Sequence, residues 1–203
     1  MNIRTLLLCG LFLTVFAVIG RAESIWIEGE DANTKQVTRH GWYDGVKKDV
    51  LSGGEWLSHF NAQKQGLATY KFQTASSAAF KFWIRANHVQ ASLSYRMDDG
   101  DWQKIALNEN QRGAMNIARD NKPDLRFISW VGVGTLQLAA GSHQIEFRMD
   151  SGPQNHGAID CFCLTSDRWV PSGTKKPNAE PRVAGPSDWF PVILDEDPLS
   201  PES

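Results

Sequence analysis

The chain has 203 residues, of which 21 are basic and 23 are acidic. This near balance argues against nucleic acid as a partner, because domains that bind nucleic acid carry a clear basic excess. The length suits one domain of about 100 to 200 residues with additional segments at its ends.

Residues 1–22 are typical of a secretory signal peptide. Arg4 precedes the apolar run 6–19, and small residues around Ala22 offer a cleavage site. We therefore expect cleavage after Ala22 and a secreted or periplasmic protein. Because the apolar run is shorter than the roughly 20 residues that a membrane helix needs, we expect no membrane partner after cleavage. Loss of two arginines would leave 19 basic and 23 acidic residues, a net charge of −4.

Glu28 and Glu30, at the start of the mature chain, have the same strand parity and project to one side. Two carboxylates so close repel each other, so a basic partner or a cation must offset their charge. The simpler alternative is an exposed strand face with a lysine or arginine opposite.

Alternation of apolar and polar residues with a period of two dominates the chain from Ser24 to about Thr165. This period is typical of strands with one buried face, and Gly-, Pro- and Asp-rich turns separate the runs. The clearest runs are residues 70–72, 80–85, 92–97 and 144–149. The pattern predicts an all-β protein, an antiparallel β-sandwich, within a domain over residues 23–170.

Two segments interrupt or punctuate this pattern. The acidic segment 98–101 contains Asp-Gly between alternating runs, which favours a hairpin turn over a metal or catalytic site. Residues 108–126 are polar and lack alternation, so we expect a long loop with a short helical turn near residues 114–119.

The candidate ligand-binding side chains come mainly from turns and outward strand positions. Flat aromatic rings stack on the apolar face of a pyranose, and a few polar groups bind its hydroxyls. The aromatic candidates are Trp42, Tyr43, Trp83 and Trp102, and the polar candidates are Asn155, His156 and Asn87. For each aromatic residue, packing in the core is the competing interpretation.

Asp160 interrupts the apolar run 158–164 near the end of the predicted domain. A buried carboxylate needs a partner. If the first and last strands pair, Glu28, Glu30 and Asp160 could converge on one hard cation, and calcium suits such an oxygen-rich site.

After Pro171 the composition changes, since seven of the nine prolines lie in residues 171–203. We interpret this part as a Pro-rich linker or tail. Its apolar segment 189–194 either docks onto the sandwich or begins a further domain, which could be a missing downstream catalytic domain.

Three motifs together resemble carbohydrate-binding modules of families 6 and 35. They are Trp26-Ile-Glu-Gly-Glu-Asp31, Leu51-Ser-Gly-Gly-Glu-Trp56, and Gly141-Ser-His-Gln-Ile145 with Ile159-Asp160. The resemblance implies a galactose-binding-like jelly roll, glycan binding, and a structural calcium at Glu28, Glu30 and Asp160. The chain departs from the family pattern at Ala158, where those families commonly carry a sugar-binding asparagine.

The sequence therefore predicts an exported, calcium-stabilised module that binds polysaccharide without cleaving it. One alternative is the accessory N-terminal domain of a truncated glycoside hydrolase or polysaccharide lyase, or a small hydrolase in its own right. Another is a protein-interaction module.

Overall fold

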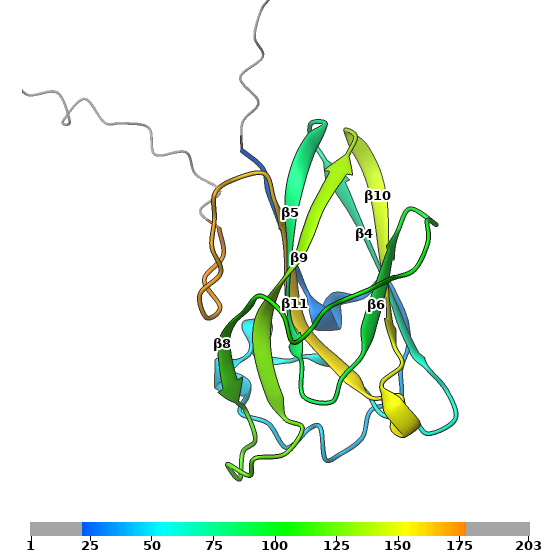
Figure 1. The fold of residues 1–203 in the computed structure, drawn as a ribbon, viewed down its shortest axis with the longest axis vertical. Coiled ribbons are helices and arrows are strands. Elements are labelled where there is room, and N and C mark those ends of the chain that lie inside the picture. The colour runs from blue at the N-terminus through cyan, green and yellow to red at the C-terminus, as the bar shows by residue number, and fades with distance from the viewer. Residues whose placement is uncertain (1–21, 178–203) are drawn as a thin grey trace, which may run out of the picture.

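Residues 22–177 are described by the computed structural model, and they form two antiparallel β-sheets packed face to face (Figure 1). Sheet A contains β1 (Ser24–Glu28), β3 (Leu57–His59), β5 (Ala78–Asn87), β8 (Gln111–Asn116), β9 (Phe127–Leu138) and β11 (Gly157–Thr165). Sheet B contains β2 (Thr34–Gln36), β4 (Gly66–Thr74), β6 (Leu93–Met97), β7 (Gln103–Lys104) and β10 (Gly141–Met149). The predicted antiparallel β-sandwich is confirmed.

Strand order places the ends of the domain side by side. Sheet A runs β1-β11-β5-β9-β8, with β3 also paired to β11, and sheet B runs β2-β4-β10-β6-β7. Short 3-10 helices lie in the connections: η1 (Gly29–Asp31), η2 (Lys48–Val50), η3 (Ser52–Gly54) and η4 (Gly152–Gln154). The first strand pairs with the last, with Glu28 opposite Cys161. This pairing is the condition under which Glu28 and Asp160 could lie close together.

The main core fills the space between the sheets. The inward residues of β5, Phe80, Phe82 and Ile84, are almost fully buried, as are Ile145 and Phe147 of β10. These residues have the parity that the alternation predicted. Their neighbours in sequence therefore project from the outer faces of the two sheets.

A second cluster, the loop-end core, lies at the end of the sandwich where the long connections meet. Its buried members are Tyr43, Val46, Leu51, Trp56, Ile117, Ile128 and Ala158. The segment 37–56 and η4 both lie at this end (Figure 1). Apolar side chains thus fill the base of the loops.

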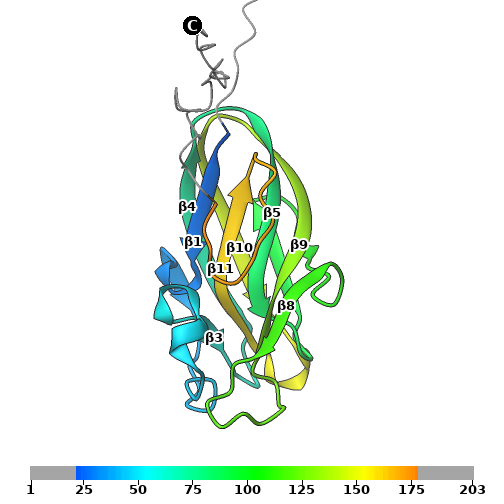
Figure 2. The same cartoon turned by 90° about the vertical axis from the view of Figure 1, so that its left-hand side faces the viewer.

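The chain continues past β11 as a strap, residues 166–177, that packs on the outer face of sheet A (Figure 2). The backbone carbonyl of Gly173 accepts a hydrogen bond of 2.8 Å from Trp130 Nε1. Trp169 contacts the rings of Trp26 and Trp130 edge-on, at centroid distances of 6.0 and 5.6 Å. Packing therefore extends beyond the predicted boundary at residue 170. The apolar segment 189–194 lies outside the described residues.

The structure corrects the expectation for residues 108–126. Residues 111–116 form the edge strand β8 rather than a loop, and the described segment contains no helical turn. Most side chains of β8 are exposed, so it pairs with β9 through backbone groups without an alternating pattern. Residues 98–99 form a turn, as predicted, and both have positive φ.

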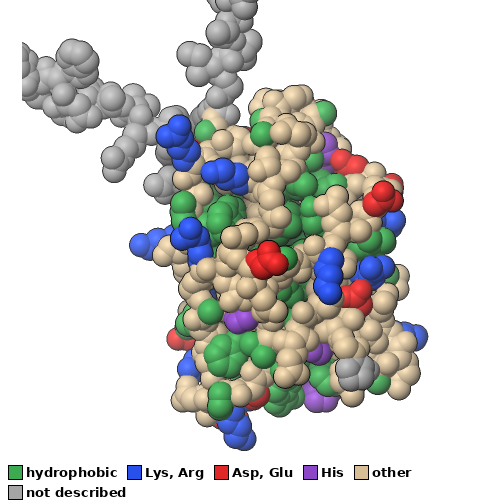
Figure 3. All heavy atoms as spheres, viewed as in Figure 1, with side chains coloured by type: hydrophobic (Ala, Val, Ile, Leu, Met, Phe, Trp, Pro, Cys, Tyr) green, Lys and Arg blue, Asp and Glu red, His purple; other side chains and the backbone are tan. Residues whose placement is uncertain are grey.

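Charged side chains of both signs are interspersed on the face that Figure 3 shows. Within residues 22–177, no helix is long and apolar enough to cross a membrane.

Candidate functional site

Glu28, Glu30 and Asp160 lie around one close crossing of the chain. Gly29 separates the two glutamates, and a Cβ atom there would come within 2.1 Å of the Ile159 carbonyl oxygen. Gly53 in η3 has a φ of +66°, and a Cβ atom at this position would lie 2.6 Å from Glu30 Oε1. Glycine at both positions lets β1, η3 and β11 approach closely.

Asp160 is bound by an arginine. Its side chain is fully buried, and its Oδ2 accepts a hydrogen bond of 2.6 Å from Arg85 Nη1. The backbone N–H of Ser52 donates to Oδ1 at 2.9 Å. Burial raises the pKa of Asp160 to about 6, although the Arg85 guanidinium favours the carboxylate. At neutral pH the two side chains therefore form a buried ion pair.

The two glutamates retain unsatisfied oxygens. Glu28 Oε1 accepts a hydrogen bond from Trp26 Nε1 and forms an ion pair with Lys176 Nζ, both at 2.9 Å. Glu28 Oε2 and Glu30 Oε2 are buried and have no hydrogen-bond partner among the described residues. Burial, together with the charge of Glu28, raises the pKa of Glu30. These two carboxylates fit a hard cation such as calcium.

Asp160 does not complete a metal site as the side chains stand. Among residues 22–177, no group of three His, Cys, Asp or Glu side chains is arranged to hold a metal ion. Arg85 occupies one oxygen of Asp160 and Ser52 the other. The structure thus brings Glu28 and Glu30 together. Asp160 lies beside them, but its positively charged partner is the guanidinium of Arg85.

The loop end corrects two of the predicted sugar contacts. Tyr43 is 0% exposed and His156 is 5% exposed, and Tyr43 Oη lies 2.9 Å from His156 Nδ1. Burial raises the pKa of Tyr43 and lowers that of His156. Both residues therefore pack inside the loop end instead of presenting a surface. Ala158 is also fully buried there, where an asparagine would have offered a polar group.

The other loop-end candidates hold the loops together. Asn155 Nδ2 donates to the carbonyl of Asn61 at 3.0 Å. Asn87 is buried, and its Nδ2 donates to the carbonyls of Leu125 and Phe127. One ring face of Trp42 lies beneath the Arg126 guanidinium, whose Cζ is 4.9 Å from the ring centroid.

Trp102 lies on the outer face of sheet B. Arg96 and Arg148 project from this face, and their Cζ atoms lie 5.0 and 4.6 Å from the centroid of the Trp102 ring. Both distances are within the range of cation–π contact, so the two arginines hold the ring in place. Glu146 in turn forms an ion pair with Arg96. Trp102 is half-buried, which leaves part of the indole accessible.

Two hollows lie next to each other on this face. The smaller, about 200 Å³, is lined by Thr34, Lys35, Gln36, Leu67, Thr69, Arg96, Trp102 and Glu146. The larger, about 640 Å³, is lined by Lys71, Phe72, Gln73, Asp98, Asp99, Ser142, His143 and Gln144. Their linings follow one another along β4 and β10, and we call them together the sheet B groove.

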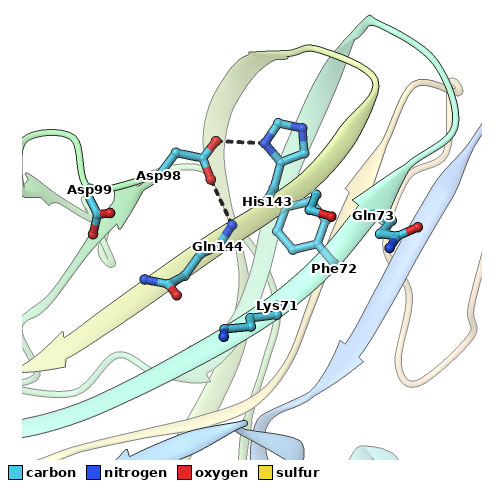
Figure 4. Close-up of a pocket in the computed structure, with 8 residues that line it drawn as sticks. Lys71, Phe72, Gln73, Asp98, Asp99, His143 and Gln144 are labelled. Carbon is cyan, nitrogen blue, oxygen red and sulfur yellow. Dashed lines mark hydrogen bonds and ion pairs between the residues drawn. The ribbon is translucent and has the colours of Figure 1, made fainter.

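Figure 4 shows how the 98–99 turn forms one wall of the larger hollow. Asp98 Oδ2 lies 2.7 Å from His143 Nδ1, and Asp98 Oδ1 accepts a hydrogen bond of 2.8 Å from the backbone N–H of Gln144. The side chains of Lys71 and Gln144, which also line the hollow, lie below this turn in Figure 4. Lys71 and Gln144 were not among the sequence candidates, although the alternating pattern of their strands indicates that both point outward.

Trp83 lies on the opposite side of the molecule, on the outer face of sheet A. It lines a hollow of about 490 Å³ together with residues of β5, β8 and β9. The four aromatic candidates are therefore divided among the loop end, sheet A and sheet B.

No protein-family model and no curated protein matches the chain. Among solved structures, a family 35 carbohydrate-binding module from an environmental isolate is similar, with a TM-score of 0.49, 13% identity, and coverage of 73% of this chain and 98% of that one. A family 26 β-1,4-mannanase with a family 35 module, from Podospora anserina, has a TM-score of 0.47, 16% identity and coverage of 73% and 29%. An exo-β-1,3-galactanase from Phanerochaete chrysosporium has a TM-score of 0.46, 12% identity and coverage of 70% and 29%. The chain thus spans 29% of the length of each enzyme.

Proposed function

We propose that this protein is an exported module that binds polysaccharide, without cleaving it, in the sheet B groove. The observation that carries the proposal is the continuity of the two hollows along β4 and β10, with Trp102 at one wall. From Leu67 to Gln73 the groove follows six residue steps, or about 20 Å at roughly 3.3 Å per residue. This length favours an extended polymer over a single small molecule.

The chemistry of the lining supports a sugar ligand. The accessible indole of Trp102 offers an apolar face for a pyranose ring. The side chains of Lys71, Gln73 and Gln144 supply donors and acceptors for hydroxyl groups. Such an open site buries little of its ligand, so we expect dissociation constants in the range of roughly micromolar to millimolar for short oligosaccharides.

Three carboxylates line the groove, and of these only Asp99 has no ion pair among the described residues, which favours binding over hydrolysis. Glycoside hydrolysis needs two carboxyl groups that act on opposite sides of the scissile bond. In the groove, Glu146 pairs with Arg96, and Asp98 pairs with His143. We therefore propose a non-catalytic module, which could target an attached catalytic domain to its substrate.

The proposal includes a structural calcium ion. Glu28 and Glu30 would hold it through their unpartnered oxygens, and the ion would offset the repulsion between the two carboxylates. Their position beside η3 supports a structural role for the ion. Residues 1–21 lie outside the described part, so export rests on the signal-like sequence.

Native affinity electrophoresis tests the proposal. The full mature chain is run through gels containing soluble mannan, galactan, xylan or polygalacturonate. We expect at least one polysaccharide to retard the wild type, and we expect Trp102→Ala to weaken binding by about tenfold, or 1.4 kcal/mol. Trp42→Ala is the matched control, because it removes another half-buried indole that an arginine covers, at a position outside the groove. Retardation of no polymer, or equal retardation of Trp102→Ala and wild type, would contradict the proposal.

A further inference from the structure

The indole of Trp83 lies flat against β9. Trp83 is paired with Gly132, and a Cβ atom on this glycine would come within 3.0 to 3.5 Å of three carbons of the six-membered ring. Only a residue without a side chain leaves the ring in this position unhindered. Trp83 thus forms a flat aromatic surface on the outer face of sheet A.

A bulge shapes the hollow beside this ring. The pairing of β5 with β9 shifts register between Phe82 and Trp83, and such a bulge bends the strand and increases its twist. Gly134, opposite Phe82, has open space where a side chain would project. The result is an accessible hollow of about 490 Å³ next to the half-buried indole.

The charges around this hollow are all positive. Lys81 and Arg112 line it, and no Asp or Glu does. Both side chains are exposed, and neither forms an ion pair among the described residues. The remaining polar lining, Asn110, Gln111 and Thr135, offers hydrogen-bonding groups without a negative charge. The sheet B groove differs, because Asp98, Asp99 and Glu146 line it.

We propose that the Trp83 hollow is a second binding site, for a saccharide that carries a carboxylate or sulfate group. The indole stacks on the sugar ring, the two cations attract the anionic group, and the amides bind hydroxyls. The site goes beyond the proposed function and does not depend on the sheet B groove. Because the two sheets pack through their inner faces, the two sites face in opposite directions. One module can therefore bind two polysaccharide chains at once.

The test compares retardation of the mature chain in gels containing polygalacturonate, dextran sulfate or neutral dextran. We expect one or both anionic polymers to retard the wild type and neutral dextran not to do so. Trp83→Ala and the double variant Lys81→Gln/Arg112→Gln should each weaken this binding by at least about tenfold. The controls are Trp42→Ala and Lys64→Gln/Arg119→Gln, which remove an indole or two exposed positive charges outside the lining of the hollow. The double variant changes only exposed residues, so it keeps the test valid if Trp83→Ala fails to fold.

Preference for polygalacturonate would assign a carboxylate as the anionic group, and preference for dextran sulfate would assign a sulfate. Wild-type migration unaffected by both anionic polymers would overturn the inference. The inference would also be overturned if the charge variant lost binding while folded Trp83→Ala bound as well as the wild type. Binding of the anionic polymer would then not need the indole as a stacking surface. The sheet B proposal is tested separately by Trp102→Ala, so either site can fail while the other stands.

Discussion

At the scale of single residues, the buried ion pair between Arg85 and Asp160 is the strongest link between distant parts of the chain. Arg85 Nη1 donates both to Asp160 Oδ2, at 2.6 Å, and to the Val50 carbonyl, at 3.0 Å. Asp160 also accepts from the Ser52 backbone. The pair therefore fixes the segment before η3 against β5 and β11.

Replacing Arg85 with alanine should leave Asp160 buried without its cation. We expect the free energy of unfolding to fall by about 3 to 5 kcal/mol, as when one partner of a buried pair is removed. Urea denaturation followed by tryptophan fluorescence measures this loss. Lys122→Ala is the control, because its side chain is 73% exposed in its pair with Asp120 and should contribute less than about 1 kcal/mol. Similar small losses in both variants would show that the buried pair is not formed.

His143 should make stability depend on pH. Its Nδ1 lies 2.7 Å from Asp98 Oδ2 and its Nε2 lies 2.9 Å from the Ala139 carbonyl, so the doubly protonated ring satisfies both acceptors. Burial opposes the charge, but these two acceptors outweigh it and raise the pKa of His143. The contribution is therefore fully present below the unfolded pKa of about 6.5 and is lost as pH rises through the higher folded pKa.

Thermal unfolding between pH 5 and pH 9 tests this effect. The difference in Tm between wild type and His143→Gln should be largest below about pH 6.5 and should shrink at higher pH. Asp98→Asn, which removes the partner carboxylate, should show the same trend. A difference that grows with pH would contradict the assignment.

At the scale of elements, the clearest alternating runs lie in strands of the structure, whereas residues 111–116, expected as part of a loop, form the strand β8. Runs such as 80–85 and 144–149 alternate because one face lies in the main core. β8 lies at the edge of sheet A with mostly exposed residues, so its sequence carries no period. The part of the strap after residue 170 has the proline-rich composition of a linker, and local composition does not show that the Gly173 carbonyl accepts a hydrogen bond from Trp130.

The strap should contribute to the stability of the domain. In the full chain, Trp169→Ala removes the ring that contacts Trp26 and Trp130, and we expect a loss of about 1 to 3 kcal/mol in the free energy of unfolding. Val170→Ala is the neighbouring control, since Val170 is 54% exposed and should cost less than about 0.5 kcal/mol. Equal effects of the two substitutions would mean that the strap does not pack on sheet A in solution.

The candidate site shows the same division between what was and was not predictable. Parity placed Trp83 on an outer face, and the condition set for bringing Glu28 near Asp160, pairing of the first and last strands, is met by β1 and β11. Parity could not show that Arg85 reaches Asp160, because Arg85 is an outward residue that becomes buried under neighbouring segments. Tyr43 was placed in a loop correctly, but its burial depends on packing with residues distant in sequence.

At the scale of the whole molecule, a calcium ion held by Glu28 and Glu30 would stabilise the folded domain. Because a ligand that binds only the folded state stabilises it, calcium should raise the Tm and EDTA should reverse the rise. We expect Glu28→Gln/Glu30→Gln to abolish the response, and the exposed Glu109→Gln to retain it. A wild type that responds to neither calcium nor EDTA would remove calcium from the proposal and leave the glycan groove unaffected.

The groove lies away from the loop end, which holds Ala158 at the position where families 6 and 35 commonly carry a sugar-binding asparagine. There Ala158, Tyr43 and His156 are buried. Sheet B instead carries polar side chains along neighbouring strands, with an indole held by two arginines. The outer face of sheet B is therefore the surface at which we propose that the sandwich binds glycan.

The most direct test of this central claim is nuclear magnetic resonance of the 15N-labelled domain, titrated with oligosaccharides from the polymer that retards it most. Binding in the sheet B groove predicts that amide shifts concentrate on residues 67–73 of β4, 142–146 of β10 and the 98–102 turn. Shifts confined to residues 40–46 and 155–158 would place the sugar at the loop end and contradict the account.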